Sequence, residues 1–274
     1  SDQADAAGAL PFTVQTLREP IFLDDIGLRS LSAVEAYGNF SAGTISDPVR
    51  PLIEEMRYSA VTSLLLRDRD QYRLLDEQGR CLILTIGGGG KTLGFGLANY
   101  DFTPTCSHFS EVNGRQMAVV AAGNGFVYRL DKGNTFDGQP IRASLRLNFN
   151  IAQSPTTQKR WRKAVIDITT TGRQTIKVQP IFNFGNADVA PAAVSDTNRQ
   201  VITELQGLVE AGGVWDVDEW DEFIWDGQLL SEAYTDIVGS GRAMALVIFS
   251  EGVEAPPFTL NGVVLHYSIR GLKR

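Results

Sequence analysis

Short apolar segments, separated by turn signals at an even spacing, are the feature of this sequence that most constrains its fold. Between residues 62 and 131, runs of roughly five to eight residues recur about every ten residues. Two of the breaks carry Asn-Gly, the dipeptide favoured in tight hairpin turns, at Asn113-Gly114 and Asn124-Gly125. This rhythm predicts an antiparallel meander. The expected strands are Thr62–Asp68, Gln71–Leu75, Arg80–Ile86, Lys91–Phe102, Cys106–Val112, Gln116–Ala121 and Gly125–Asp131.

An approximate repeat lies within this meander, in the segments Arg69–Asp76 and Gly125–Asp131. The phrase Tyr-Arg-Leu begins at Tyr72 in the first segment and at Tyr128 in the second, 56 residues further on. Each copy is followed by a turn and another expected strand. The offset is close to the roughly 40 to 50 residues of a four-stranded propeller blade, so the first half is expected to contain propeller-like blades.

The pattern changes after Asn150. Residues 152–157 (AQSPTT) have the composition of a linker, and the segments after them alternate more regularly. In Gly262–Arg270 an apolar set at odd positions alternates with a more polar set, as in a strand buried on one face. The fold is therefore expected to be all-β, with a partial β-propeller-like meander in residues 1–150 and a β-sandwich in residues 151–274. The other expected sandwich strands are Ala164–Thr170, Thr175–Phe182 and Arg242–Ser250, and the few short helices are expected at Ser46–Arg57 and Asp196–Glu210.

Charge is unevenly distributed along the chain. Acids outnumber bases 32 to 25, and the net charge of −7 argues against a dedicated nucleic-acid binder, because phosphate contacts need a basic excess. Residues 200–241 contain ten acids and neither Lys nor Arg, whereas a short basic run is formed by Lys159, Arg160, Trp161, Arg162 and Lys163. In a homo-oligomeric ring these two patches can meet across each subunit boundary. The alternatives for the basic run are a solvated strand edge and a contact with nucleic acid.

The acidic stretch also contains three of the four tryptophans. Trp215, Trp220 and Trp225 recur every five residues, with Asp218 and Asp221 between them. Asp216 and Asp218 have the spacing of the first ligands in a calcium-binding loop. However, Trp220 occupies the next ligand position, and no glycine follows where that loop must turn. A carboxylate pair beside aromatic rings also fits a glycosidase site. Because tryptophan is a usual anchor of protein interfaces, these five residues and the basic run are taken as interface candidates.

No catalytic residues, cofactor or metal are expected. The segment Thr85–Thr92 (TIGGGGKT) resembles a phosphate-binding P-loop, but it lacks the first glycine of that motif and is followed by β-like residues. It is interpreted as a hairpin loop, with a P-loop nucleotide binder as a third functional option. His108 and His266 lie in strand-like contexts and are expected to be structural. Cys81 and Cys106 match no disulfide or metal spacing, so each is expected to be buried.

Targeting and membrane signals are absent from the sequence. No segment reaches the ~18 to 20 consecutive apolar residues of a membrane helix, so no membrane partner is expected. The chain begins at Ser1 with neither signal-peptide features nor an initiator Met, which leads us to expect a processed chain or a fragment.

Three phrases carry a resemblance to a known family. They are Asp24–Leu31 (DDIGLRSL), Tyr37–Pro48 with the following Pro51-Leu-Ile-Glu, and Asp70–Leu75 (DQYRLL). Over residues 20–150 the chain resembles the C-terminal part of the tail nozzle (tail tubular) proteins of short-tailed bacteriophages. In that family a Gly-Leu/Ile-Arg-Ser-Leu strand precedes a Ser-Asp-x-Gly-x-Pro-Ile-Asp type of stretch. Residues 46–51 match the second stretch in part, without its Gly and final Asp.

The resemblance implies a virion structural protein without catalytic residues. Copies of the chain would form a ring in the tail, next to adaptor or portal-proximal tail proteins, after assembly in the bacterial host cytoplasm. DNA would be retained and then conducted as a passenger without sequence specificity, and an acidic wall suits this because it repels phosphates. The alternative is a carbohydrate-binding or glycan-degrading tail module that uses residues 215–226.

Overall fold

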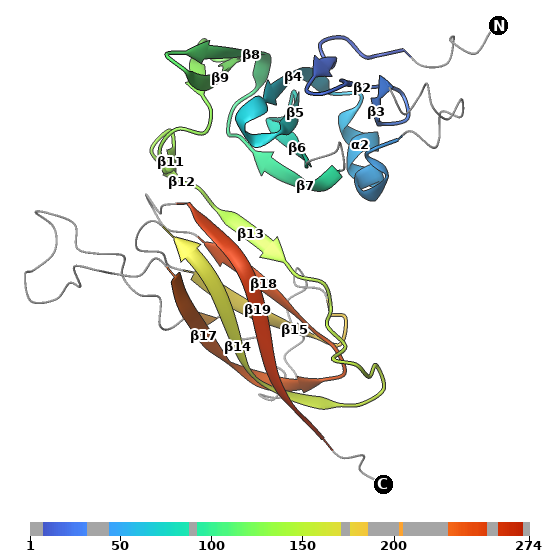
Figure 1. Cartoon of the computed structure of the whole chain (residues 1–274), viewed down its shortest axis with the longest axis vertical. Helices are drawn as coiled ribbons and strands as arrows, with labels where there is room; N and C mark the ends of the chain where they lie inside the picture. The colour runs from blue at the N-terminus through green and yellow to red at the C-terminus, as the bar shows by residue number, and fades with distance from the viewer. Residues whose placement is uncertain are drawn as a thin grey trace, which may run out of the picture. The chain divides into compact units, whose positions relative to one another are not determined.

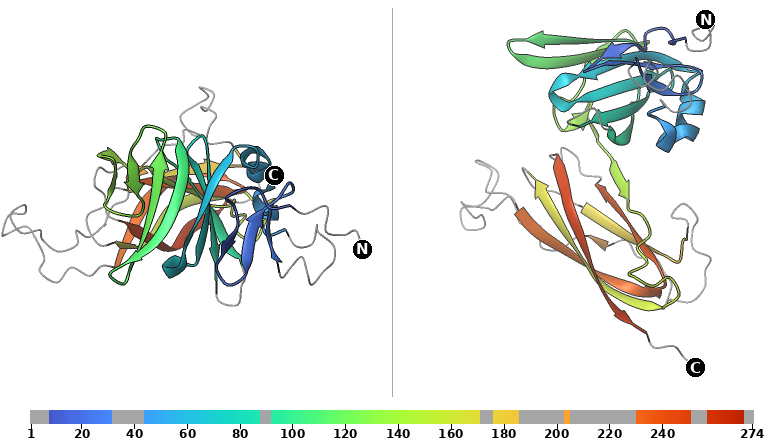
Figure 2. Two further views of the ribbon diagram at one scale, coloured as in Figure 1. Left: turned by 90° about the horizontal axis from the view of Figure 1, so that it is seen from above. Right: turned by 45° about the vertical axis from the view of Figure 1, so that its right-hand side comes forward.

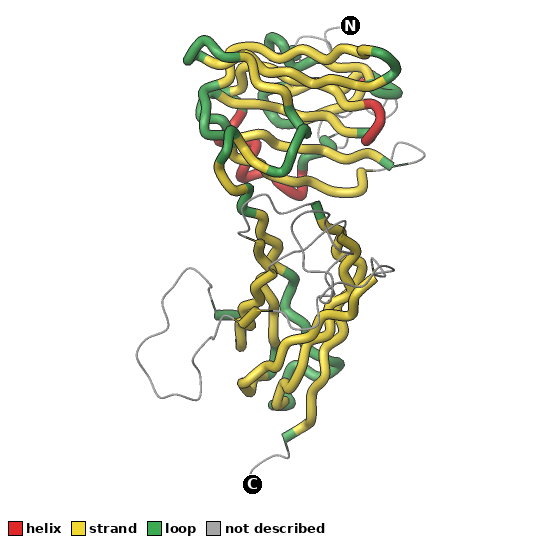
Figure 3. The backbone as a smooth tube through the Cα atoms, turned by 90° about the vertical axis from the view of Figure 1, so that its left-hand side faces the viewer, coloured by secondary structure: helices red, strands yellow, loops and turns green. Residues whose placement is uncertain are grey.

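The computed structural model describes residues 8–31, 44–87, 92–170, 176–185, 203–204, 230–250 and 257–270. It divides the chain into two compact units, Ser1–Lys132 and Gly133–Arg274, which are described separately (Figure 1). Within the described parts, regular structure is almost entirely antiparallel β-strand, as Figure 3 shows, and this confirms the all-β class. The division falls earlier than the expected boundary at Asn150, because residues 143–146 pair with a strand of the second unit.

The described part of the first unit contains three antiparallel sheets, one short α-helix and two short 3₁₀ helices. The four-stranded sheet is a meander in the order β4-β5-β6-β7, and the three-stranded sheets have the orders β1-β2-β3 and β10-β9-β8. The elements are β1 (Gln15–Thr16), β2 (Pro20–Leu23), β3 (Leu28–Ser30), η1 (Asp47–Val49), α2 (Arg50–Met56), β4 (Ala60–Leu66), η2 (Arg67–Arg69), β5 (Gln71–Asp76), β6 (Arg80–Ile86), β7 (Thr92–Asn99), β8 (Pro104–Val112), β9 (Arg115–Ala122) and β10 (Val127–Arg129).

The core of the first unit lies on one face of the four-stranded sheet. Side chains of β4, β5 and β6 pack there against β2, β3 and α2, and the cluster includes Leu28, Ile53, Tyr72 and Leu74. The stretch from η1 through α2 confirms the helix expected at Ser46–Arg57, whose apolar stripe points into this core. From Tyr72 to Asp76, β5 is buried on both of its faces, which is why it reads as a nearly continuous apolar run.

The predicted hairpin turn at Asn113-Gly114 is confirmed. It joins β8 to β9, where Val112 pairs with Arg115, so only two residues form the loop. Both have positive φ, 54° for Asn113 and 71° for Gly114, as a type I′ turn requires. The next turn, around Asn124, is a longer loop in which Gly125 alone has positive φ (86°).

The two copies of the repeated phrase lie in different kinds of sheet. The first copy forms β5, the second strand of the four-stranded meander, which has the strand number of one propeller blade. The second copy contains β10, which is the outer strand of a three-stranded sheet. The likeness between the copies therefore does not mark equivalent positions in two blades.

The second unit is a sandwich of two antiparallel sheets, as expected from the alternating patterns, and Figure 2 shows the sheets face to face. One sheet has the order β13-β18-β15-β16 and the other has the order β17-β14-β19. A small hairpin, β11-β12, precedes them. The elements are β11 (Thr135–Phe136), β12 (Gln139–Pro140), β13 (Ala143–Arg146), β14 (Lys159–Thr170), β15 (Ile176–Phe182), β16 (Thr203–Glu204), β17 (Leu230–Gly241), β18 (Met244–Ser250) and β19 (Phe258–Ile269).

The inner faces of the two sheets share one apolar core. Trp161, Ile166 and Ile168 of β14 pack with residues of β15, β17 and β18. Leu265 of β19 is partly buried and packs against this core. The predicted alternation in Gly262–Arg270 is confirmed for Val263 and Leu265, which pack against this core, but not for Ile269, which is 68% exposed. A β-bulge between Trp161 and Lys163 interrupts the pairing of β14 with both neighbours.

The second unit differs from the sequence-based expectations at one predicted helix and at one strand that was not predicted. The helix predicted at Asp196–Glu210 is wrong where the structure describes it, since Thr203 and Glu204 form β16 and pair with β15. The rest of that segment lies outside the described residues. Strand β17 was not expected, although it is as long as β14 and pairs along it.

Candidate interaction surfaces

The phrase Asp24–Leu31 forms a hairpin that encloses a buried ion pair. Arg29 Nε lies 2.6 Å from Asp24 Oδ2, and both side chains are at most 2% exposed. The other oxygen, Asp24 Oδ1, accepts hydrogen bonds from the backbone N–H groups of Ile26 and Gly27, both at 2.8 Å. The carboxylate thus shapes the turn and compensates the guanidinium charge at the same time.

Ser46, from the second family-like phrase, closes over this hairpin. Its Oγ accepts a hydrogen bond from the backbone N–H of Leu28 at 3.0 Å, and the Ile45 N–H donates to the Leu28 carbonyl at 2.8 Å. A Cβ at Gly27 would lie 2.5 Å from the same Ser46 Oγ, so the chain approaches closely only because this residue is glycine. The first two phrases are therefore parts of one local structure.

The basic run forms the first part of β14, the central strand of its sheet, rather than a strand edge. Lys159 and Trp161 are each 1% exposed. The ammonium of Lys159 lies within hydrogen-bond distance of four backbone carbonyls, which share its three N–H groups; they are those of Ile151, Ser154, Thr157 and Arg242, at 2.5 to 3.1 Å. The indole N–H of Trp161 donates to the Gly241 carbonyl at 3.3 Å. These two predicted interface residues are therefore internal to the unit.

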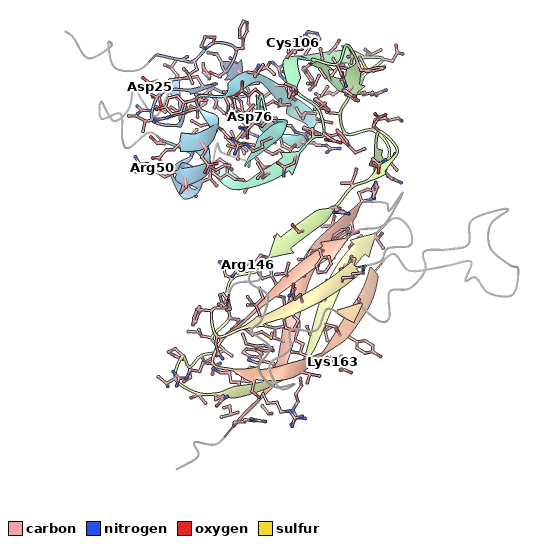
Figure 4. The ribbon with its side chains drawn as sticks, turned by 180° about the vertical axis from the view of Figure 1, so that it is seen from behind. Asp25, Arg50, Asp76, Cys106, Arg146 and Lys163 are labelled. Carbon is pink, nitrogen blue, oxygen red and sulfur yellow. The ribbon has the colours of Figure 1, made fainter. Side chains whose placement is uncertain are left out.

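The other three members of the basic run reach the outer face of the same sheet. Arg160 and Arg162 are exposed, and Arg162 Nε donates to Ser268 Oγ at 3.2 Å. The ammonium of Lys163 lies 3.8 Å from the centre of the Tyr234 ring, and its Cα partner on β17 is Asp236. Figure 4 labels Lys163 on this sheet. Part of the charge is thus engaged within the unit, which leaves a weaker patch than the sequence indicates.

The acidic interface candidates cannot be placed. Trp215, Asp218, Trp220, Asp221 and Trp225 all lie outside the described residues. Lys91 of the P-loop-like segment lies outside the described residues as well.

Of the two cysteines, Cys81 is buried as we expected and Cys106 is not. Cys81 is buried as predicted, and burial raises the pKa of its thiol to about 12. The prediction for Cys106 is wrong, because this residue is exposed on β8 (Figure 4). Both His108 and His266 are exposed on strands. Across the parts of the chain that the structure describes, no group of three or more His, Cys, Asp or Glu side chains could hold a metal ion.

A further surface, which the sequence patterns missed, is the outer face of the sheet β10-β9-β8. It borders a hollow of about 500 Å³ lined by Val112, Asn113, Met117, Arg129 and Lys132. The lining combines two cations with apolar side chains. Strand alternation alone did not reveal this face, because the face on which a residue lies depends on the pairing register of all three strands.

These features define an all-β protein of two compact units with candidate binding surfaces on exposed sheet faces. No protein-family model matches the chain, and no curated protein matches it either. None of the helices in the described ranges has the length and apolar character needed to cross a membrane.

Proposed function

We propose that this protein is a virion structural component that assembles as a ring in the tail or neck of a bacteriophage. One observation supports the proposal most: the three phrases that resemble the tail nozzle family converge on one hydrophobic core. Leu28 of the first phrase, Ile53 of the Pro51-Leu-Ile-Glu that belongs to the second, and Tyr72 and Leu74 of the third are all part of it. Residues with a shared structural task are expected to be retained together, so their joint occurrence favours a common architecture.

The ion pair at this core strengthens the same inference. Desolvation of two buried charges costs free energy. The presence of both charged residues in one hairpin therefore indicates that they have a specific structural role. Asp24 and Arg29 are both members of the family-like phrase, and Ser46 of the next phrase accepts a hydrogen bond from the backbone N–H of Leu28, the residue before Arg29. The resemblance thus rests on residues that cooperate physically.

The charge of the chain agrees with a conduit for DNA. A net charge of −7 disfavours tight binding of phosphates, which would hold DNA in place. We expect weak, salt-sensitive binding with a Kd in the nonspecific range of about 10⁻⁴ to 10⁻⁶ M. Binding that is tight and specific for one sequence would contradict the role of DNA as a passenger.

Imaging of the purified chain and of virions tests the proposal. Mass photometry and negative-stain electron microscopy of the full chain are expected to show closed rings, and an antibody against the chain is expected to label the tail. A strict monomer that is missing from virions would overturn the proposal. The carbohydrate alternative stays a prediction from residues 215–226, and loss of polysaccharide depolymerisation in Asp218→Asn or Asp221→Asn would favour it instead.

A further inference from the structure

The outer face of the sheet β10-β9-β8 is open and largely apolar. Residues paired directly across antiparallel strands lie on the same face, so the register assigns each side chain to one side. The inner side carries Ala118, Val120 and Ala122, all buried. The outer side carries Cys106, His108, Ser110 and Val112 of β8, Met117, Val119 and Ala121 of β9, and Val127 and Arg129 of β10.

Several apolar side chains on this face are in contact with solvent. Val127 is 67% exposed and Val112 is 47% exposed, with His108 and Cys106 also exposed beside them. No Asp or Glu occurs among the residues that the register assigns to this face. A contiguous apolar face of this kind, rimmed by polar groups, is typical of an interaction surface.

Two cations at one side of the face are available to a partner. Arg129 and Lys132 line the 500 Å³ hollow, and neither has an ion pair within the residues that the structure describes. The nearest acid in sequence, Asp131, does not neutralise them, because its carboxylate is engaged with Arg73 and Arg69 at 2.7 and 3.2 Å. The hollow therefore offers uncompensated positive charge next to apolar surface.

We propose that this face binds the acidic, tryptophan-rich segment 215–226 of a second copy of the chain. The segment has six acids and no base, together with three Trp, one Phe and one Ile, so its charge and its apolar content both complement the face. The basic run of β14 is a poorer acceptor, because Lys159 is buried and Lys163 already contacts Tyr234. The inference rests on the proposed function in one respect, namely that copies of the chain assemble.

A charge exchange between the two surfaces tests this contact. The variant R129E/K132E makes the face acidic, and D216K/D218K/D221K/E222K changes the net charge of the segment from −6 to +2. Each alone is expected to weaken self-association at least tenfold in mass photometry, while a 1:1 mixture regains it, because each face then meets a segment of opposite charge. The matched control R142E/R270E inverts two exposed charges in the other unit, outside the interface candidates, and is expected to assemble like the wild type. Circular dichroism of each variant verifies folding.

The outcomes separate this contact from the broader proposal. If the wild type assembles and R129E/K132E assembles equally well, the contact is overturned and the ring remains. If the mixture does not regain assembly, the segment does not bind this face of another copy, and the contact is again overturned. If R129E/K132E loses only binding to a DNA oligonucleotide, the hollow serves phosphates instead. A wild type that is monomeric at all concentrations overturns the ring and the contact together.

Discussion

The guanidinium of Arg73 and the carboxylate of Asp131 form a two-pronged ion pair across 58 residues of sequence, with N–O distances of 3.1 and 2.7 Å. Arg73 belongs to the first copy of the repeated phrase, and Asp131 ends the second. The two copies are therefore connected by a contact between β5 and the residues after β10. This pair fixes the loop after β10 to the four-stranded sheet.

Loss of the Asp131 charge is expected to destabilise the first unit. In Asp131→Asn, the guanidinium of Arg73, only 3% exposed, keeps its charge without its main partner. We expect a loss of about 2 kcal/mol, less than the roughly 3 to 5 kcal/mol for fully buried pairs, because Asp131 is a quarter exposed. Urea unfolding measures it. The control Glu54→Gln removes an exposed pair with Arg50 and should cost less than about 0.5 kcal/mol, so equal losses would contradict the prediction.

Two glycines with similar backbone angles are expected to respond differently to alanine. Gly79 has φ +84°, and an added Cβ would lie 2.3 Å from the Tyr100 carbonyl oxygen, whereas Gly114 has φ +71° with nothing within 4 Å. Gly114→Ala should cost about 1 kcal/mol from backbone strain alone. Gly79→Ala should cost at least twice as much, since backbone atoms must move. Thermal unfolding of both variants measures the two losses of stability. A smaller loss in Gly79→Ala than in Gly114→Ala would contradict the prediction.

The Lys159 ammonium is expected to hold the segment before β14 in place. In Lys159→Met, the four carbonyls lose the ammonium that donates hydrogen bonds to them, and three of these carbonyls belong to residues 151–157. We expect about 3 kcal/mol of lost stability, together with faster proteolysis of that segment, since unsatisfied buried polar groups cost roughly 1 to 3 kcal/mol each. The neighbouring variant Arg160→Met, at an exposed position, should stay within about 0.5 kcal/mol of the wild type. Identical proteolysis patterns would rule the role out.

The two cysteines are expected to differ sharply in reactivity. Burial raises the pKa of the Cys81 thiol to about 12, so at pH 8 to 10 it stays protonated and shielded in the folded chain. A thiol reagent should label one cysteine quickly under native conditions and both in denaturant. In Cys106→Ser, native labelling should disappear. Rapid native labelling of that variant would show that Cys81 is accessible.

Most strands of the fold could be predicted from local sequence patterns, but strand β17 could not. Strands such as β6 were predicted because they are apolar and bounded by turns. Strand β17 was missed because its inward residues include Ala233, Thr235 and Gly239, which give a weak apolar signal. Gly239 is required by a distant neighbour, since a Cβ there would lie 2.2 Å from the Phe182 ring of the facing sheet. Such a constraint cannot be recognised within one segment.

The candidate surfaces were less predictable than the strands. Five charged or aromatic residues in a row indicated a solvent-facing patch at the start of β14, yet Lys159 is buried because carbonyls from residues 151–157 and from Arg242 surround it. The outer face near Arg129 was missed for the opposite reason. Its members are spread over three strands, and only their pairing brings them together.

The bulge in β14 changes which positions of that strand are core. Before it, the odd-numbered residues Lys159 and Trp161 point inward, whereas after it the even-numbered residues, from Ala164 to Thr170, do so. The bulge therefore shifts the inward-facing positions of β14 from odd to even residue numbers, and Arg162 is the extra residue at the bulge. Two residues, Arg162 and Lys163, separate the inward-facing Trp161 from the inward-facing Ala164, whereas a regular strand has one residue between successive inward positions. Deletion of one of these two residues would give the spacing of a regular strand, so both halves would keep facing the core once the bulge is removed.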